Sequence, residues 1–178
     1  MRFIPKVVCF VLIFLVRSHG LLASPYPGMG SSALVDPQIG AFLTARGYSM
    51  NTSGTAWIPI ADVDGSLRLQ LPSQPAATLA LHFDEVPPNV KLDLYAKKWA
   101  REYSQFGFEI LGSQTVQLSG HESMVIDLVQ KSKSQQLRQV LIKKEKKVAI
   151  FTCRDQQAPF LKTLPTCNQV IRTFRFLE

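Results

Sequence analysis

The sequence predicts an α+β domain in which helices pack on one antiparallel sheet. Four strand-like segments follow one another over 108–118, 123–130, 136–142 and 148–153, separated by short polar turns. Consecutive strands joined by short turns favour antiparallel pairing. A helix-like segment at 90–106 precedes them, and the whole chain of 178 residues is 46% hydrophobic, enough to bury one core of ordinary size.

The first 23 residues have the pattern of a secretory signal peptide. Two basic residues precede an unbroken apolar run at 7–16, which Arg17 ends. Ten apolar residues fall short of the ~20 that a membrane-spanning helix needs. We expect cleavage after Gly20 or Ala23 and a periplasmic or extracellular protein, the alternative being an uncleaved N-terminal anchor.

Cleavage would change the charge of the protein. The segment carries three of the 20 basic residues and none of the 13 acidic ones, so the net charge would fall from +7 to +4. Much of the basic character therefore belongs to the export signal. No basic stripe interleaved with aromatic residues is present, and we expect no nucleic-acid partner.

A leader and a first group of strands follow the signal. Residues 24–47 form a leader whose first part is rich in Gly, Pro and Ser, with a possible short helix at 37–46 ended by Gly47. The domain itself is predicted over 48–178. Its first three strands are expected at 57–60, 67–71 and 78–83. A hairpin turn at Asp62–Gly65 would join the first two of them.

Helix 90–106 is predicted from apolar residues three and four positions apart. Asn89 is a suitable N-cap and Gly107 a natural end. The stripe consists mainly of large side chains, namely Leu92, Tyr95, Trp99, Tyr103 and Phe106. We expect this stripe to face the sheet.

The C-terminal region is also predicted to be helical. Pro165 would stand near the start of the second part of this region, where the missing N–H costs least. The predicted buried face comprises Leu161, Leu164, Cys167, Ile171 and Phe174.

The order of these elements resembles the PsbP-like superfamily over about residues 48–178. The resemblance rests on the helix at 90–106, the segment 107–111, the turn at 118–121, the long hairpin after it and the closing segment 171–174. The superfamily includes the photosystem extrinsic protein PsbP, a nuclear Ran-binding protein and many exported bacterial proteins. The resemblance implies an α-β-α sandwich and a non-enzymatic accessory or binding role, and it carries over no site residue.

Cys153 and Cys167 are the two cysteines that remain after export, because Cys9 lies in the signal. In an oxidising compartment an even number of cysteines favours a disulfide. This bridge would join the last strand of the meander to the C-terminal helix. The alternative is two separate buried thiols that pack as small apolar groups.

The densest charge cluster contains Lys143, Lys144, Lys146 and Lys147. Such a cluster can contact anionic lipid, polysaccharide or an acidic partner protein. It can equally be a solvated hairpin tip that prevents edge-to-edge aggregation. The sequence leaves both interpretations open.

Two histidines remain after export. His82 and His121 could join the nearby carboxylates in a metal site only if their two segments meet, and no close ligand spacing supports this. No G-x-S-x-G nucleophile motif is present either. We therefore predict neither a metal nor a cofactor.

These observations favour a non-enzymatic, exported accessory or binding protein of the cell envelope. An alternative is a carrier that holds an apolar small molecule between the aromatic helix and the sheet. A hydrolase that uses His82 or His121 is a further alternative.

Overall fold

A computed structural model describes residues 37–60 and 66–178, apart from the side chains of residues 37 and 38. The predicted signal peptide, most of the leader and the predicted hairpin turn at Asp62–Gly65 lie outside the described residues. All described residues fall within one compact unit of the chain. No described helix is long and apolar enough to cross a bilayer.

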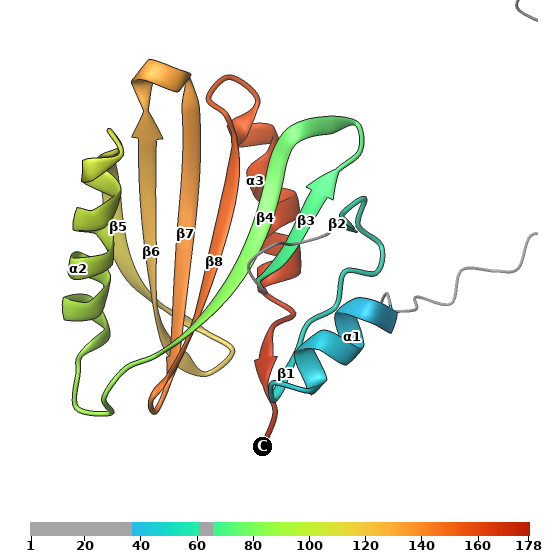
Figure 1. The fold of residues 1–178 in the computed structure, drawn as a ribbon, viewed down its shortest axis with the longest axis vertical. Coiled ribbons are helices and arrows are strands. Elements are labelled where there is room, and N and C mark those ends of the chain that lie inside the picture. Colours follow the sequence, from blue (N-terminus) through green and yellow to red (C-terminus); the bar gives the residue numbers. More distant parts are fainter. Residues whose placement is uncertain (1–36, 61–65) are drawn as a thin grey trace, which may run out of the picture. The chain divides into compact units, whose positions relative to one another are not determined.

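Seven of the described strands form one antiparallel sheet in the order β2-β3-β4-β8-β7-β6-β5 (Figure 1). The four strands of this sheet that come last in the sequence form the predicted meander, in which the second, third and fourth each pair with the strand before. The strands are β2 (Ile58–Ile60), β3 (Leu67–Leu71), β4 (Gln74–Glu85), β5 (Glu109–Leu118), β6 (His121–Gln130), β7 (Gln135–Lys144) and β8 (Lys147–Gln156).

Helices cover both faces of the sheet. Helix α2 (Leu92–Gln105) packs on β5 and β6, and helix α3 (Phe160–Ile171) packs on β8 and β4. Figure 1 shows α2 in front of the sheet and α3 behind it. We call these the α2 face and the α3 face. The predicted α-β-α sandwich is confirmed.

The side-chain alternation of β8 separates two hydrophobic cores. Phe151 and Cys153 belong to the core under α3, whereas Val148 and Ile150 belong to the core under α2. Successive residues of a strand point to opposite faces, so β8 contributes to both cores in turn. The sheet is therefore the shared wall between the two layers.

A short helix and a small second sheet lie on the α3 face. Helix α1 (Pro37–Thr44) corresponds to the short helix predicted in the leader, and its Ile39 and Leu43 are buried in the α3-side core. Strand β1 (Tyr48–Ser49) pairs antiparallel with β9 (Arg175–Phe176). The sequence did not indicate this pair, because two-residue strands carry no periodic signal.

Helix α2 is present where it was predicted, but its proposed N-cap is wrong. The Val90 N–H donates to the Pro87 oxygen, so residues 87–90 form a turn before the helix begins. Lys91 takes the N-cap position, and its side chain makes no capping hydrogen bond. Gly107, with φ +79°, ends the helix as predicted.

The C-terminal region is one helix rather than two parts. Pro165 lies inside α3 and removes one N–H from the helix interior. The carbonyl that loses this donor belongs to Leu161, whose residue is 74% exposed, so water can reach that side of the helix. Phe174 is fully buried as predicted, but it lies beyond the end of α3.

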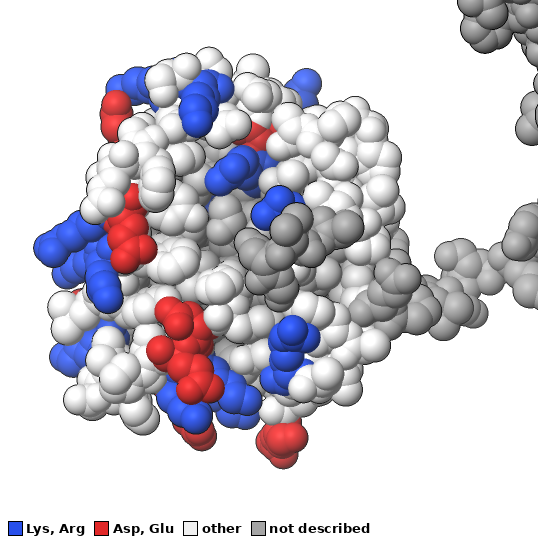
Figure 2. Space-filling view, viewed as in Figure 1, with Lys and Arg blue, Asp and Glu red and all other residues white. Residues whose placement is uncertain are grey.

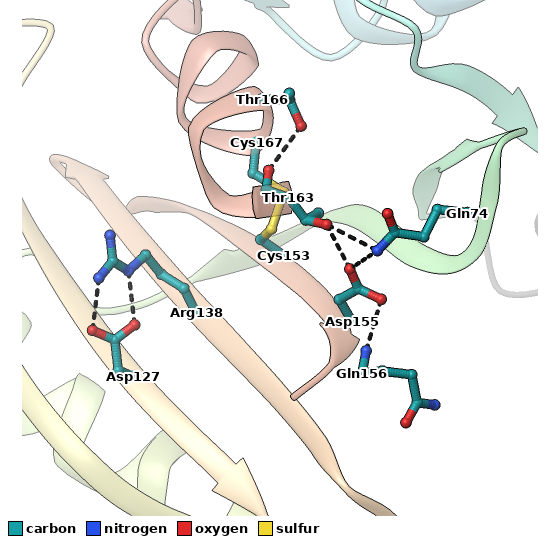
Figure 3. The surroundings of a disulfide bond; sticks show 9 residues. All are labelled: Gln74, Asp127, Arg138, Cys153, Asp155, Gln156, Thr163, Thr166 and Cys167. Atoms are coloured by element: carbon teal, nitrogen blue, oxygen red, sulfur yellow. Dashed lines mark hydrogen bonds and ion pairs between the residues drawn. A yellow bond between two sulfur atoms is a disulfide. The ribbon is translucent and has the colours of Figure 1, made fainter. Parts of the chain in front are cut away.

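A disulfide joins α3 to β8. Cys153 and Cys167 are bonded, with Cα atoms 6.1 Å apart, and both residues are fully buried (Figure 3). The Cα separation lies within the normal range for disulfides. The bond therefore links helix to strand as the sequence suggested.

A buried carboxylate lies beside the disulfide. Asp155 is 1% exposed, and its oxygens accept hydrogen bonds from the Thr163 hydroxyl, the Gln74 amide and the Gln156 N–H (Figure 3). These donors satisfy a charge that would otherwise be costly to bury. The group connects the start of β4, the end of β8 and the first turns of α3.

Candidate functional site

A cleft of about 460 Å³ opens on the α2 face, between the second half of α2 and the sheet. Figure 2 shows this face, with basic side chains around the upper end of the sheet, where β8 ends. The cleft is lined by residues of α2, β6, β7, β8 and the connecting turns, namely Trp99, Glu102, Tyr103, Phe106, Phe108, Gln130, Lys133, Gln135 and Arg154.

Aromatic rings form one wall of the cleft. The centroids of Trp99 and Tyr103 are 6.1 Å apart, and Tyr103 meets Phe108 edge-on at 5.5 Å. Along α2 the small residues Ala96 and Ala100 occupy the line closest to the sheet and are buried. The larger rings therefore lie at the margin of the helix contact, where they remain partly accessible.

Two cationic side chains come from the sheet side. Arg154 belongs to β8, where alternation places it on the same face as Ile150, under α2. Lys133 comes from the 3₁₀ turn η1 (Lys131–Lys133) that joins β6 to β7. Glu102 of α2 is the one carboxylate among the lining residues. The charged groups of the lining thus sum to one positive charge.

Two buried polar atoms on the α2 side of the sheet have no hydrogen-bond partner. Gln139 is fully buried, and its Nε2 donates to the Thr152 hydroxyl at 3.3 Å while its Oε1 accepts nothing. The buried indole N–H of Trp99 also has no acceptor. Buried polar groups in proteins are nearly always hydrogen-bonded, so these two atoms are exceptions within the α2-side core.

Tyr103 connects the aromatic wall to these polar groups. Burial raises the pKa of its phenol, while the charge of Arg154 and hydrogen bonds from Thr152 and Gln139 oppose that rise. The phenol thus stays protonated at neutral pH and lies close to the guanidinium. The cleft combines flat apolar surface with donors suited to an anion.

The two histidines do not meet. The His82 ring stacks near Trp99 with centroids 6.3 Å apart, and the His121 ring lies edge-on to Phe176 at 5.0 Å. Within the described residues neither imidazole hydrogen-bonds to a hydroxyl or a carboxylate. Those residues also contain no group of three or more His, Cys, Asp or Glu side chains placed to hold a metal ion. The described residues therefore do not assemble a site for the alternative of a hydrolase that uses His82 or His121.

The lysine cluster lies at the tip of the β7–β8 hairpin. Lys143 points toward the α2 face, where its ammonium donates to the carbonyls of Pro88, at 3.1 Å, and Val90. These carbonyls belong to the loop before α2. Lys143 is therefore held by the protein itself.

The other three lysines of the tip have separate surroundings. Lys146 pairs with Glu85 at 3.5 Å, and the Lys147 ammonium lies 5.5 Å from the centre of the Tyr48 ring. Lys144 and Lys147 pair across the hairpin and follow the α3 face. The structure thus distributes the four predicted contact residues over two faces.

The sequence reasoning missed most of the cleft. It found the aromatic stripe but not Arg154, Lys133 or Gln139. One signal was available, because Gln139 and Arg154 are polar residues at positions of apolar strands that alternation directs toward α2. Their meeting with Lys133 depends on strand order, which the sequence does not specify.

Comparison with known proteins identifies the fold. No protein-family model matches the sequence, and neither does any curated protein. Among solved structures, cyanobacterial PsbP (CyanoP) from Synechocystis sp. PCC 6803 matches with a TM-score of 0.58 and 14% identity, over 86% of this chain and 98% of that one. The chain therefore has a PsbP-like fold.

A second solved structure is also similar to this chain in fold. The protein of unknown function PA94 from Pseudomonas aeruginosa matches with a TM-score of 0.54 and 23% identity, over 65% of this chain and 86% of that one. Both matches fall below 25% identity, so they concern the fold alone.

Proposed function

We propose that the chain is an exported, non-enzymatic accessory protein of the cell envelope that binds a small ligand in the cleft beside α2. The ligand would have a flat aromatic or apolar body and a negatively charged group. The observation that carries this proposal is the meeting of Arg154 and Lys133 with the Trp99 and Tyr103 rings. Export is supported by the N-terminal sequence pattern and by the disulfide.

The size and composition of the cleft support a small molecule. A volume of about 460 Å³ lies within the usual range for small-molecule sites. An anionic group would meet Arg154 or Lys133, and a ring would stack on Trp99 or Tyr103.

A carrier of a wholly apolar molecule is the second candidate, and the aromatic wall favours it. The polar part of the lining argues against it, since Gln135 and the two cations would lose water without gaining a partner. The two candidates therefore differ in whether the ligand needs a charge.

A pair of fluorescent probes separates these candidates. One is 8-anilinonaphthalene-1-sulfonate, an aromatic anion, and the other is N-phenyl-1-naphthylamine, which has the same rings without the sulfonate. We expect the anion to bind the folded protein more tightly and to quench Trp99 fluorescence. Equal binding of both probes would favour the apolar carrier, and binding of neither would contradict the proposed site.

Matched variants locate the binding. Arg154→Gln should weaken binding of the anionic probe by at least roughly tenfold, since a charge-assisted hydrogen bond contributes about 1.5–3 kcal/mol. Lys162→Gln, an exposed change on α3, should leave binding unaltered. Equal affinities in both variants would place the probe elsewhere on the protein.

A further inference from the structure

We infer that the outer edge of β5 pairs with β5 of a second copy of this chain, antiparallel across a two-fold axis near Thr115. The sheet would then continue through both copies. This inference rests on the edge of the sheet and is independent of the ligand cleft.

Strand β5 is a long edge without a described neighbour. It is the last strand of the sheet, and its outer edge pairs with no strand among residues 37–60 and 66–178. Only Val116 and Leu118 are half-buried, and the other residues of β5 are exposed. An edge of this kind presents a row of free N–H and C=O groups to another strand.

The usual protection of an edge strand is absent over most of β5. From Ile110 to Leu118 the strand contains no charged residue and no proline. The opposite edge differs, because β2 has three residues and contains Pro59. Natural sheets protect their edges with short strands, proline or charge, so β2 is protected and β5 is not.

The sequence of β5 is complementary to itself. The register of β5 shifts between Ile110 and Gly112, so regular pairing is available from Gly112 onward. Antiparallel pairing centred on Thr115 sets Gln114 opposite Val116, and Ser113 opposite Gln117. Two threonines face each other at the axis, a favourable cross-strand pair, and no like charges are opposed. A two-fold axis requires this self-complementarity.

Charges beside the strand favour the same arrangement. On the α2 face, Lys97 and Arg101 lie in a groove with Ser113, and Glu122 lies opposite Gln117 on β6. In the proposed dimer Ser113 of one copy lies opposite Gln117 of the other. Lys97 and Arg101 of one copy therefore approach Glu122 of the other. This complementarity selects a second copy over an unrelated extended segment as the occupant of the edge.

Sedimentation analysis of the purified protein tests this inference. We expect a reversible monomer–dimer equilibrium. Thr115→Lys should raise the dissociation constant at least about tenfold, because it opposes two like charges directly. Ser73→Lys, in the exposed turn between β3 and β4, adds the same charge away from β5 and should leave the dimer unchanged.

A cysteine variant tests the register. Thr115→Cys should form a disulfide between copies on mild oxidation, because opposed residues of an antiparallel pair have Cα atoms ~4.5–5.5 Å apart. Ser73→Cys should not. A protein that stays monomeric at its highest soluble concentration would overturn the inference. A dimer that Thr115→Lys leaves intact, or that Thr115→Cys fails to cross-link, would also overturn it.

Discussion

The Tyr95 hydroxyl donates a hydrogen bond of 2.5 Å to the Asp84 carboxylate, and this bond joins the first turn of α2 to the end of β4. Burial is the main cause that raises the pKa of Tyr95, and the hydrogen bond and charge of Asp84 raise it further. The same two residues enclose the loop that leads from the sheet into the helix. The bond therefore couples the position of α2 to the protonation of one phenol.

Stability should fall in alkali, in part because of Tyr95. An unfolded tyrosine ionises near pH 10, whereas the folded-state pKa of Tyr95 is higher. Its contribution is thus complete below about pH 10 and is lost as the pH rises toward the folded-state pKa. Tyr95→Phe should lower the free energy of unfolding at pH 7 by ~1–2 kcal/mol and reduce its decline above pH 10. Urea unfolding across this pH range measures both, and identical alkaline declines would contradict the role of Tyr95.

The disulfide should stabilise the fold measurably. Cys153 and Cys167 are 14 positions apart, and closing a loop of this length contributes about 3 kcal/mol in the chain-entropy treatment. Replacing both cysteines by alanine should lower the free energy of unfolding by about this amount or slightly more, since both sites are buried. Urea unfolding with and without reductant is the measurement.

The bond itself can be checked on the unreduced protein. Alkylation under denaturing conditions, followed by peptide mass analysis, should find Cys153 and Cys167 unmodified and linked. Alkylated peptides containing these two residues would refute the bridge.

Lys143 should stabilise the start of α2, whereas Lys144 should not. Lys143→Met removes two hydrogen bonds to the carbonyls of Pro88 and Val90 and should cost about 1–2 kcal/mol. Lys144→Met removes the same charge on the α3 face and should change stability by less than ~0.5 kcal/mol. Amide hydrogen exchange at Leu92–Tyr95 should accelerate in the first variant only, and equal exchange in both would contradict the assignment.

The sequence predicted the regular elements well because their apolar periodicity is local. The stripe of α2 extends over 14 residues, and β5 to β8 are ten-residue strands rich in apolar residues and separated by short polar turns. The hairpin between β3 and β4 was missed because Pro72 and Pro75 lie where strand signals are weakest. The continuous α3 was missed because Pro165 normally ends a helix, yet here the freed carbonyl lies at the exposed Leu161.

The cleft was harder to predict because it depends on contacts between distant segments. Trp99 and Tyr103 were identified as one stripe, but ordinary core packing accounts for such a stripe equally well. Whether Arg154 and Lys133 reach these rings depends on the order of β6, β7 and β8 in the sheet and on the side that α2 covers. Neither property is encoded in the spacing of the residues themselves.

Strand β8 also limits how the chain can change in length. Arg154 faces the cleft, and its neighbour Cys153 faces the disulfide on the opposite side of the sheet. Inserting or deleting one residue earlier in β8 would exchange these directions, placing a guanidinium in the α3-side core and a thiol in the cleft. Homologues with this architecture should therefore keep the length of β8 constant and accommodate insertions in the turns at its two ends.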